Sequence, residues 1–155
     1  MNHKIKKQKG ITLVELLVVV AILAIMGGVT GVFLIKYLPE YHLRAAANNL
    51  VQDLQLARVN ALKTLRTQSV TFTKGAEHSY SINDNATGTI KKVDLKQYPF
   101  QIQFGEIKFI TDNKIEFNAE GYKVESTNAL IEIKNSKGSV IKTEITRTGS
   151  IRATR

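Results

Sequence analysis

The most constraining feature of this sequence is an apolar stretch near its N-terminus. Residues Ile11 to Ile35 contain one charged side chain, Glu15, and follow the basic leader MNHKIKKQKG. The uncharged run from Leu16 to Ile35 would reach roughly 30 Å as an α-helix, which matches the hydrocarbon thickness of a bilayer. The pattern therefore predicts a helix that spans a membrane.

The charges before this stretch predict its orientation. Lys4, Lys6, Lys7 and Lys9 all precede it, and positive charge is biased toward the cytoplasmic side of a membrane. We therefore expect a single pass through the cytoplasmic (inner) membrane with the N-terminus inside. The chain from Pro39 onward would be periplasmic or extracellular.

Three kinds of N-terminus share these features. A cleaved secretory signal peptide has a shorter apolar core, of about 7–15 residues, and no carboxylate in its first turns. A plain single-pass anchor fits the length but leaves Glu15 unexplained, because an ionised carboxylate within a span costs about 3 kcal/mol. A third kind of N-terminus provides Glu15 with a cation.

The junction Lys9-Gly10-Ile11-Thr12-Leu13-Val14-Glu15 resembles the processing signal of type IV pilins and type II secretion pseudopilins. In that family a prepilin peptidase cuts after the glycine, here Gly10, and the new terminal amine, here on Ile11, is N-methylated. The family most often has phenylalanine where this chain has Ile11. The resemblance implies that Glu15 pairs with the terminal amine of a neighbouring pilin in a filament, since a carboxylate in an apolar medium needs a cation.

Small residues within the apolar stretch are candidates for helix packing. Gly27 and Gly31 form one pair at a spacing of four residues, and Ala24 and Gly28 form a second. Such pairs allow helices to approach closely in a membrane or filament core. The alternative is that these glycines only loosen the helix.

A second helix is predicted after Pro39. Apolar residues there recur at spacings of three and four, which is typical of an amphipathic helix with one buried face. They are Leu43, Ala47, Leu50, Leu54, Ala57 and Ala61. Pro39 lies between the two apolar patterns, and it either kinks a continuous helix or begins its second half.

After Arg66 the apolar pattern alternates with a period of two, which predicts half-buried strands. The alternating sets are Val70/Phe72, Tyr80/Ile82, Ile102/Phe104, Ile107/Phe109, Ile115/Phe117, Ile131/Ile133 and Ile141/Thr143/Ile145. We therefore predict an α+β, pilin-like lollipop, in which a long N-terminal helix packs on a C-terminal antiparallel β-sheet head. Its expected parts are a leader (1–10), a transmembrane or filament-core helix (11–38), an amphipathic helix (39–66) and the head (67–155).

Three stretches of the head narrow the resemblance. Ala57 to Ala61, Ile115 to Gly121 and Thr148 to Arg152 resemble elements of the GspH/FimT group of minor pilins, and the competence pseudopilin ComGD has a similar layout. The absence of cysteine argues against a major pilin, many of which close a C-terminal loop with a disulfide. The resemblance implies a structural subunit, with other pilins, prepilin peptidase and the membrane as partners. A type II secretion pseudopilus, a type IV pilus and a competence machine all remain open.

The sequence does not predict an enzyme, a cofactor or a metal site. His3, His42 and His78 have no metal-ligand spacing, and there is no cysteine to complete a site. We interpret all three as surface histidines. The side chains of Asn83-Asp84-Asn85 could offer oxygen ligands to calcium, but the further acidic residues of a calcium loop are missing. We therefore expect a solvated turn there.

The charge distribution suggests a second function. The formal net charge is +9, but basic and acidic residues balance between Pro39 and Ile133, and the excess of the head lies in 134–155. This segment contains the candidate DNA-binding residues Lys142, Arg147, Arg152 and Arg155. A basic surface attracts the phosphates of double-stranded DNA.

A resemblance to FimT-type pilins also implies DNA uptake. In those proteins a C-terminal Gly-Arg-x-Arg element binds DNA; Gly149 and Arg152 match it here, whereas Ser150 replaces its first arginine. The alternative is a solvated edge strand, which proteins often load with Lys and Arg. A filament subunit and a DNA-binding pilin are thus the two functional hypotheses.

Overall fold

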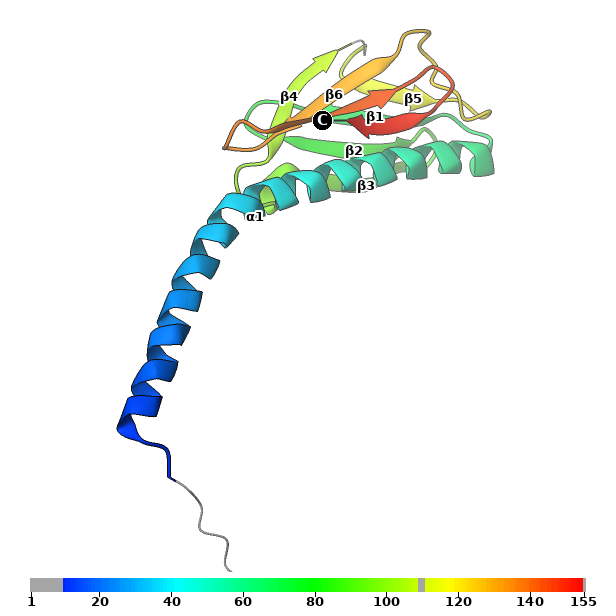
Figure 1. Cartoon of the computed structure of the whole chain (residues 1–155). Helices are drawn as coiled ribbons and strands as arrows, with labels where there is room; N and C mark the ends of the chain where they lie inside the picture. The colour runs from blue at the N-terminus through cyan, green and yellow to red at the C-terminus, as the bar shows by residue number, and fades with distance from the viewer. Residues whose placement is uncertain (1–9, 109–110, 155) are drawn as a thin grey trace, which may run out of the picture. The chain divides into compact units, whose positions relative to one another are not determined.

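A computed structural model describes residues 10–108 and 111–154 of the chain. Its elements, in chain order, are α1 (Leu13–Thr64), β1 (Gln68–Thr73), β2 (Ser79–Asp84), β3 (Gly88–Asp94), the 3₁₀-helix η1 (Leu95–Gln97), β4 (Gln103–Lys108), β5 (Lys114–Phe117), β6 (Ala129–Lys134), β7 (Val140–Ile145) and β8 (Ile151–Thr154) (Figure 1). The chain divides into two compact units, one that ends at Tyr37 and one that begins at Leu38. Helix α1 contributes residues to both units.

The first unit contains the predicted membrane span. Within residues 10–108 and 111–154, no helix is both long enough and apolar enough to be a candidate for crossing a membrane. The prediction for Leu16 to Ile35 is therefore not confirmed. Side chains 29, 30, 32 and 33 belong to that stretch and lie outside those that the structure describes.

The second unit begins with the amphipathic half of α1. The six predicted stripe residues, Leu43, Ala47, Leu50, Leu54, Ala57 and Ala61, are all buried, so this prediction is confirmed. The helix ends at Thr64, and Pro39 lies inside it. The side-chain amide of Asn135, at the end of β6, donates to the Pro39 carbonyl oxygen at 3.2 Å. This contact joins the first turn of the head's helix to the sheets.

The strands form two antiparallel sheets, which the green to red part of the chain builds above the second half of α1, from Leu38 onward, in Figure 1. The first has the order β3-β2-β1-β5 and the second the order β4-β6-β7-β8. Aromatic rings join them, because Phe72 of β1 packs edge-on against Phe104 of β4 with ring centroids 5.6 Å apart. The buried core residues begin at Leu43, so the second unit has a core of its own. The predicted α+β fold is confirmed.

Strand β4 explains an irregularity in the apolar pattern. Ile102 and Phe104 are buried at even positions, whereas the next apolar residue of the strand, Ile107, is at an odd position. The pairing of β4 with β6 shifts register between Phe104 and Ile107. A bulge adds one residue and so returns the side chains to the core face. Phe109, the partner of Ile107 in the predicted alternation, lies outside the described residues.

Two smaller expectations hold only in part. In the expected solvated turn Asn85 is exposed, but the carboxylate of Asp84 is buried and accepts hydrogen bonds from the backbone amides of Ala86 and Thr87 and from the Gln68 side chain. These hydrogen bonds, that of Ala86 first, lower the pKa of Asp84. His42 and His78 are half-buried rather than on the surface, because they pack on aromatic rings. His3 lies outside the described residues.

Candidate functional site

The first candidate site is the start of α1. Gly10, Ile11 and Thr12 precede the helix, which begins at Leu13. The backbone N–H of Glu15 donates to the Thr12 hydroxyl oxygen at 3.2 Å, so Thr12 is the N-cap and Glu15 the third residue of the helix. A threonine N-cap followed three residues later by glutamate has the sequence of a capping box. A carboxylate there also interacts favourably with the helix dipole.

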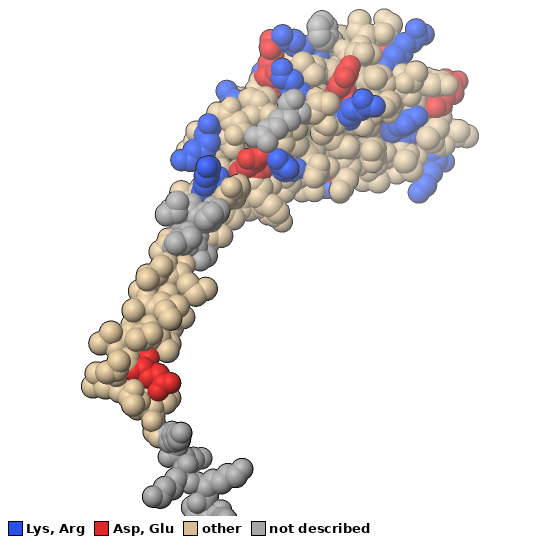
Figure 2. All heavy atoms as spheres, viewed as in Figure 1, with Lys and Arg blue, Asp and Glu red and all other residues tan. Residues whose placement is uncertain are grey.

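The residues around the predicted cleavage point are accessible. Ile11 is 78% exposed and Leu13 79% exposed, and a Cβ atom added to Gly10 would meet nothing within 4 Å. In Figure 2 the lower part of the first unit's helix is tan apart from red atoms near its start, and the described part of the unit also contains the exposed Lys36. Glu15 is its one acidic residue, so a single negative charge lies on an exposed apolar helix.

The predicted packing glycines leave open space on this helix. Ala24, Gly27, Gly28 and Gly31 are all exposed. A Cβ atom added to any of the three glycines would meet nothing within 4 Å. A second helix is therefore free to approach closely along these residues.

The second candidate site is the basic C-terminal segment, which the structure arranges differently from the expectation. Lys142 and Arg152 point outward from the second sheet, and acidic residues alternate with them. Lys142 lies opposite Glu132 and pairs with it at 3.4 Å, and Arg152 lies opposite Glu144. Blue and red side chains also alternate over the face of the head in Figure 2. This sheet face is mixed in charge rather than uniformly basic.

Arg147 lies away from that sheet face, in the turn between β7 and β8. Its backbone carbonyl accepts a hydrogen bond from the Lys123 amide at 3.0 Å, and its side chain is exposed. Arg155 lies outside the described residues. The structure therefore brings Lys142 and Arg152 onto one sheet face and places Arg147 at the end of their hairpin.

Next to that turn, Arg58 of α1 joins two loops that are distant in sequence. Its Nε donates to the Gly121 carbonyl at 2.9 Å and its Nη2 to the Thr148 carbonyl at 3.4 Å. The three stretches that resemble the GspH/FimT group meet at these contacts. No sequence pattern indicates the role of Arg58, whereas the Thr12-x-x-Glu15 spacing could have indicated the helix cap.

Charged side chains are also buried near this junction. Lys123 has no exposed side-chain surface, and its ammonium group bonds Glu125 at 2.5 Å and the Thr127 carbonyl at 3.1 Å. Burial acts to raise the pKa of Glu125, but hydrogen bonds from Lys123 and Thr111 outweigh it and hold the pKa below its usual value. A second buried charge lies on α1 itself. The carboxylate of Asp53 accepts hydrogen bonds from the Tyr80 hydroxyl at 2.7 Å and from the Lys91 ammonium group at 2.6 Å.

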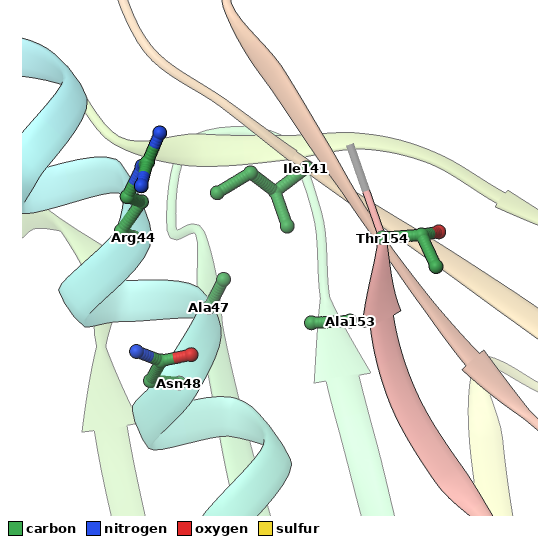
Figure 3. A pocket seen from close by; sticks show the side chains of 6 residues that line it. All are labelled: Arg44, Ala47, Asn48, Ile141, Ala153 and Thr154. Carbon is green, nitrogen blue, oxygen red and sulfur yellow. The ribbon is translucent and has the colours of Figure 1, made fainter.

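A pocket of about 310 Å³ lies between α1 and the β7–β8 hairpin. Six residues line it (Figure 3): Arg44, Ala47 and Asn48 from α1, and Ile141, Ala153 and Thr154 from the hairpin. The Ile141 and Ala153 side chains point toward the helix, whereas that of Thr154 points away from it. Its one charged group, the Arg44 guanidinium, pairs with Glu40 at 2.7 Å. In the described part of the chain, no cluster of three potential metal ligands is found.

Comparisons with known proteins identify a motif and a fold in this chain. Residues 5–31 match the model of the prokaryotic N-terminal methylation motif. The long helix on antiparallel sheets is an α+β pilin fold. The chain shares this fold with the type IV minor pilin FimU of Pseudomonas aeruginosa.

Two crystal forms of FimU carry this similarity. One gives a TM-score of 0.62 at 23% identity and covers 75% of this chain and 90% of FimU. The other gives 0.58 at 23% identity and covers 72% and 92%. No curated protein sequence matches the chain. The likeness shows the fold, and the narrower assignment to the GspH/FimT group stays a prediction.

Proposed function

We propose that this chain is a minor pilin or pseudopilin, a structural subunit rather than an enzyme. Prepilin peptidase cleaves it after Gly10, Ile11 becomes N-methylated, and the apolar stretch holds it in the cytoplasmic membrane until a filament takes it up. The filament is a type II secretion pseudopilus or a type IV pilus, and the subunit acts near its tip or in its initiation. The methylation motif at residues 5–31 and the minor-pilin fold support this proposal.

One observation carries the proposal: Glu15 is a lone carboxylate on an exposed apolar helix. The backbone N–H of Glu15 already donates to the Thr12 hydroxyl in the helix cap. In an apolar filament core, however, the Glu15 carboxylate would lose its contact with water. The amine created on Ile11 of a neighbouring subunit provides the missing cation. The open surface at Gly27, Gly28 and Gly31 lets the neighbouring helix approach.

The test separates the charge of Glu15 from its place in the helix cap. Glutamine also fits the third position of a capping box but carries no charge. We therefore expect Glu15→Gln and Glu15→Ala to be cleaved normally and to be absent from sheared filaments, whereas Glu15→Asp retains partial incorporation. Normal incorporation of Glu15→Gln would contradict the pairing role.

A second candidate function is DNA binding for uptake in natural transformation. Arg147 and Arg152 are both exposed on the β7–β8 hairpin, and neither forms an ion pair within the described residues. Two accessible guanidinium groups on one hairpin are suited to phosphate contacts. The acidic residues beside Lys142 and Arg152 weigh against a broad binding surface.

Titration of the head, residues 38–155, with double-stranded DNA at several salt concentrations tests this candidate. A DNA-binding head should lose affinity steeply as salt rises, and Arg147→Ala with Arg152→Ala should abolish binding. Lys92→Ala with Lys96→Ala removes the same charge elsewhere and is the control. Equal binding by both double variants would contradict a specific role for the hairpin.

A further inference from the structure

The residue that follows α1 is unusual in both conformation and exposure. Leu65 has a φ of 52°, in the left-handed region, and its side chain is 75% exposed. The residue after a helix often adopts this conformation, but it is usually glycine and sometimes asparagine, because a Cβ atom is disfavoured there. Leucine thus adds strain and gains no burial within the described chain.

Other exposed apolar side chains occur at the same end of the head. Leu62, 43% exposed, contacts Gly121, and the next residue, Tyr122, is 50% exposed; Val124 is 53% exposed. Tyr122 and Val124 line a hollow of about 510 Å³ together with Arg147. We call Leu62, Leu65, Tyr122, Val124 and Arg147 the helix-end surface. Tyrosine and arginine beside aliphatic groups are typical of the energetic centre of protein interfaces.

Cations lie on this surface and beside it. Lys63, Arg66 and Arg147 are exposed, and none of them forms an ion pair within the residues that the structure describes. The acidic residue of the hollow, Glu120, accepts a hydrogen bond from the Asn118 side chain at 2.9 Å. The surface therefore complements apolar side chains that are flanked by carboxylates.

We propose that the helix-end surface docks the head of a different pilin-like subunit, which presents apolar side chains flanked by carboxylates. This inference rests on the proposed function, since it names a partner of the same filament subunit. Elsewhere on the described head, the exposed large apolar residues are Leu38, Tyr41, Leu56, Val59 and Ile90. The carboxylates that neighbour them along α1 are already paired, Glu40 with Arg44 and Asp53 with Lys91, so these residues are not flanked by carboxylates that could pair with the cations of the helix-end surface. A second copy of this chain therefore does not fit as the partner.

A protein partner also fits better than DNA. Leu62, Leu65 and Val124 offer aliphatic surface, whereas double-stranded DNA is bound mainly through polar and charged contacts to its phosphates.

The strain at Leu65 provides a test that separates docking from folding. Leu65→Gly and Leu65→Asn relieve the backbone and should raise the melting temperature of the head by a few degrees. The same variants should cut the partner contact about tenfold, because the apolar side chain is lost. Ile90→Asn removes an equally apolar exposed side chain from β3 and should leave the contact unchanged.

The contact is measured with a photocrosslinking amino acid at Tyr122 of the full-length chain, in cells that assemble the filament. The expected adduct joins this residue to an Asp/Glu-containing head peptide of another protein with an N-terminal methylation motif, and Leu65→Gly and Arg147→Glu weaken it. An adduct with a second copy or with DNA, no adduct, or an adduct unchanged by Leu65→Gly would overturn the proposal. Incorporation into filaments is scored in the same cells, so that incorporation without an adduct rejects the docking surface alone, whereas failure of the unmodified chain to incorporate rejects the proposed function.

Discussion

Gly149 lies so close to Arg58, and to the Gly121 carbonyl that Arg58 binds, that a side chain at position 149 would force its neighbours to shift. A Cβ atom on Gly149 would come within 2.7 Å of the Arg58 Nε and would also collide with the Gly121 carbonyl oxygen. Gly149 has a φ of 78°, which side chains rarely adopt. The helix, the turn at Gly121 and the turn at Thr148 are thus fixed to one another at a single point.

The first prediction concerns this glycine. Gly149→Ala should lower the free energy of unfolding of the head by about 3 kcal/mol, because a left-handed backbone and a steric clash both oppose alanine. Gly138→Ala is the matched control, since Gly138 has a φ of 81° but nothing within 4 Å of an added Cβ. Urea titration measures the free energy of unfolding of both variants, and the difference between their losses is the cost of the steric clash. Equal losses would show that the Arg58 contact does not constrain position 149.

The second prediction concerns Arg58 itself. Arg58→Met keeps the aliphatic stem but removes the donors to the Gly121 and Thr148 carbonyls, and should cost about 2 kcal/mol of unfolding free energy. Arg44→Met, on the same helix, removes an exposed pair with Glu40 and should cost less than about 1 kcal/mol. A smaller loss for Arg58→Met than for Arg44→Met would contradict the role of Arg58 in joining the loops.

Sequence periodicity was sufficient for the helix and for most strands, because their side chains alternate between core and solvent. It missed β3, where Val93 is the buried residue and the rest of the strand is exposed, so that there is no alternation to detect. It also did not predict that β4 is one strand, since the bulge between Phe104 and Ile107 reverses the phase of the pattern.

The candidate sites show a similar limit. Gly10, Ile11 and Glu15 are local in sequence, and a motif identifies them. The basic segment was predicted from a charge count over residues 134–155, which excludes Glu132. In the folded sheet, the register of β6 and β7 places Glu132 opposite Lys142. A charge count along the sequence cannot reveal that pairing. The contacts of Arg58 with residues 63 and 90 positions away are tertiary and equally invisible to periodicity.

A third prediction follows from the low pKa of Glu125. Because the carboxyl is more acidic in the folded state than in the unfolded chain, its ionised form stabilises the head above the usual carboxyl pKa, near 4. That contribution is lost as pH falls through the folded-state value. The difference in unfolding free energy between the unmodified head and Glu125→Gln should therefore be largest near pH 7 and shrink below about pH 4.

Lys123→Met provides the control for this pH dependence. Without the ammonium group that bonds Glu125 at 2.5 Å, the pKa of Glu125 should move toward its ordinary value. The loss of unfolding free energy caused by Glu125→Gln should then depend less on pH. An unchanged pH profile in the Lys123→Met background would show that the ion pair is not its cause.

The proposed function depends on how the N-terminus is processed, and the mass of the mature N-terminal peptide is the strongest test of it. Filaments or membranes from cells that make the full-length chain are digested, and the first peptide is sequenced by mass spectrometry. We predict a peptide that begins at Ile11 and carries an N-methyl group. A chain that still begins at Met1, or that is cleaved beyond the apolar stretch as a secretory signal would be, would contradict the proposed function.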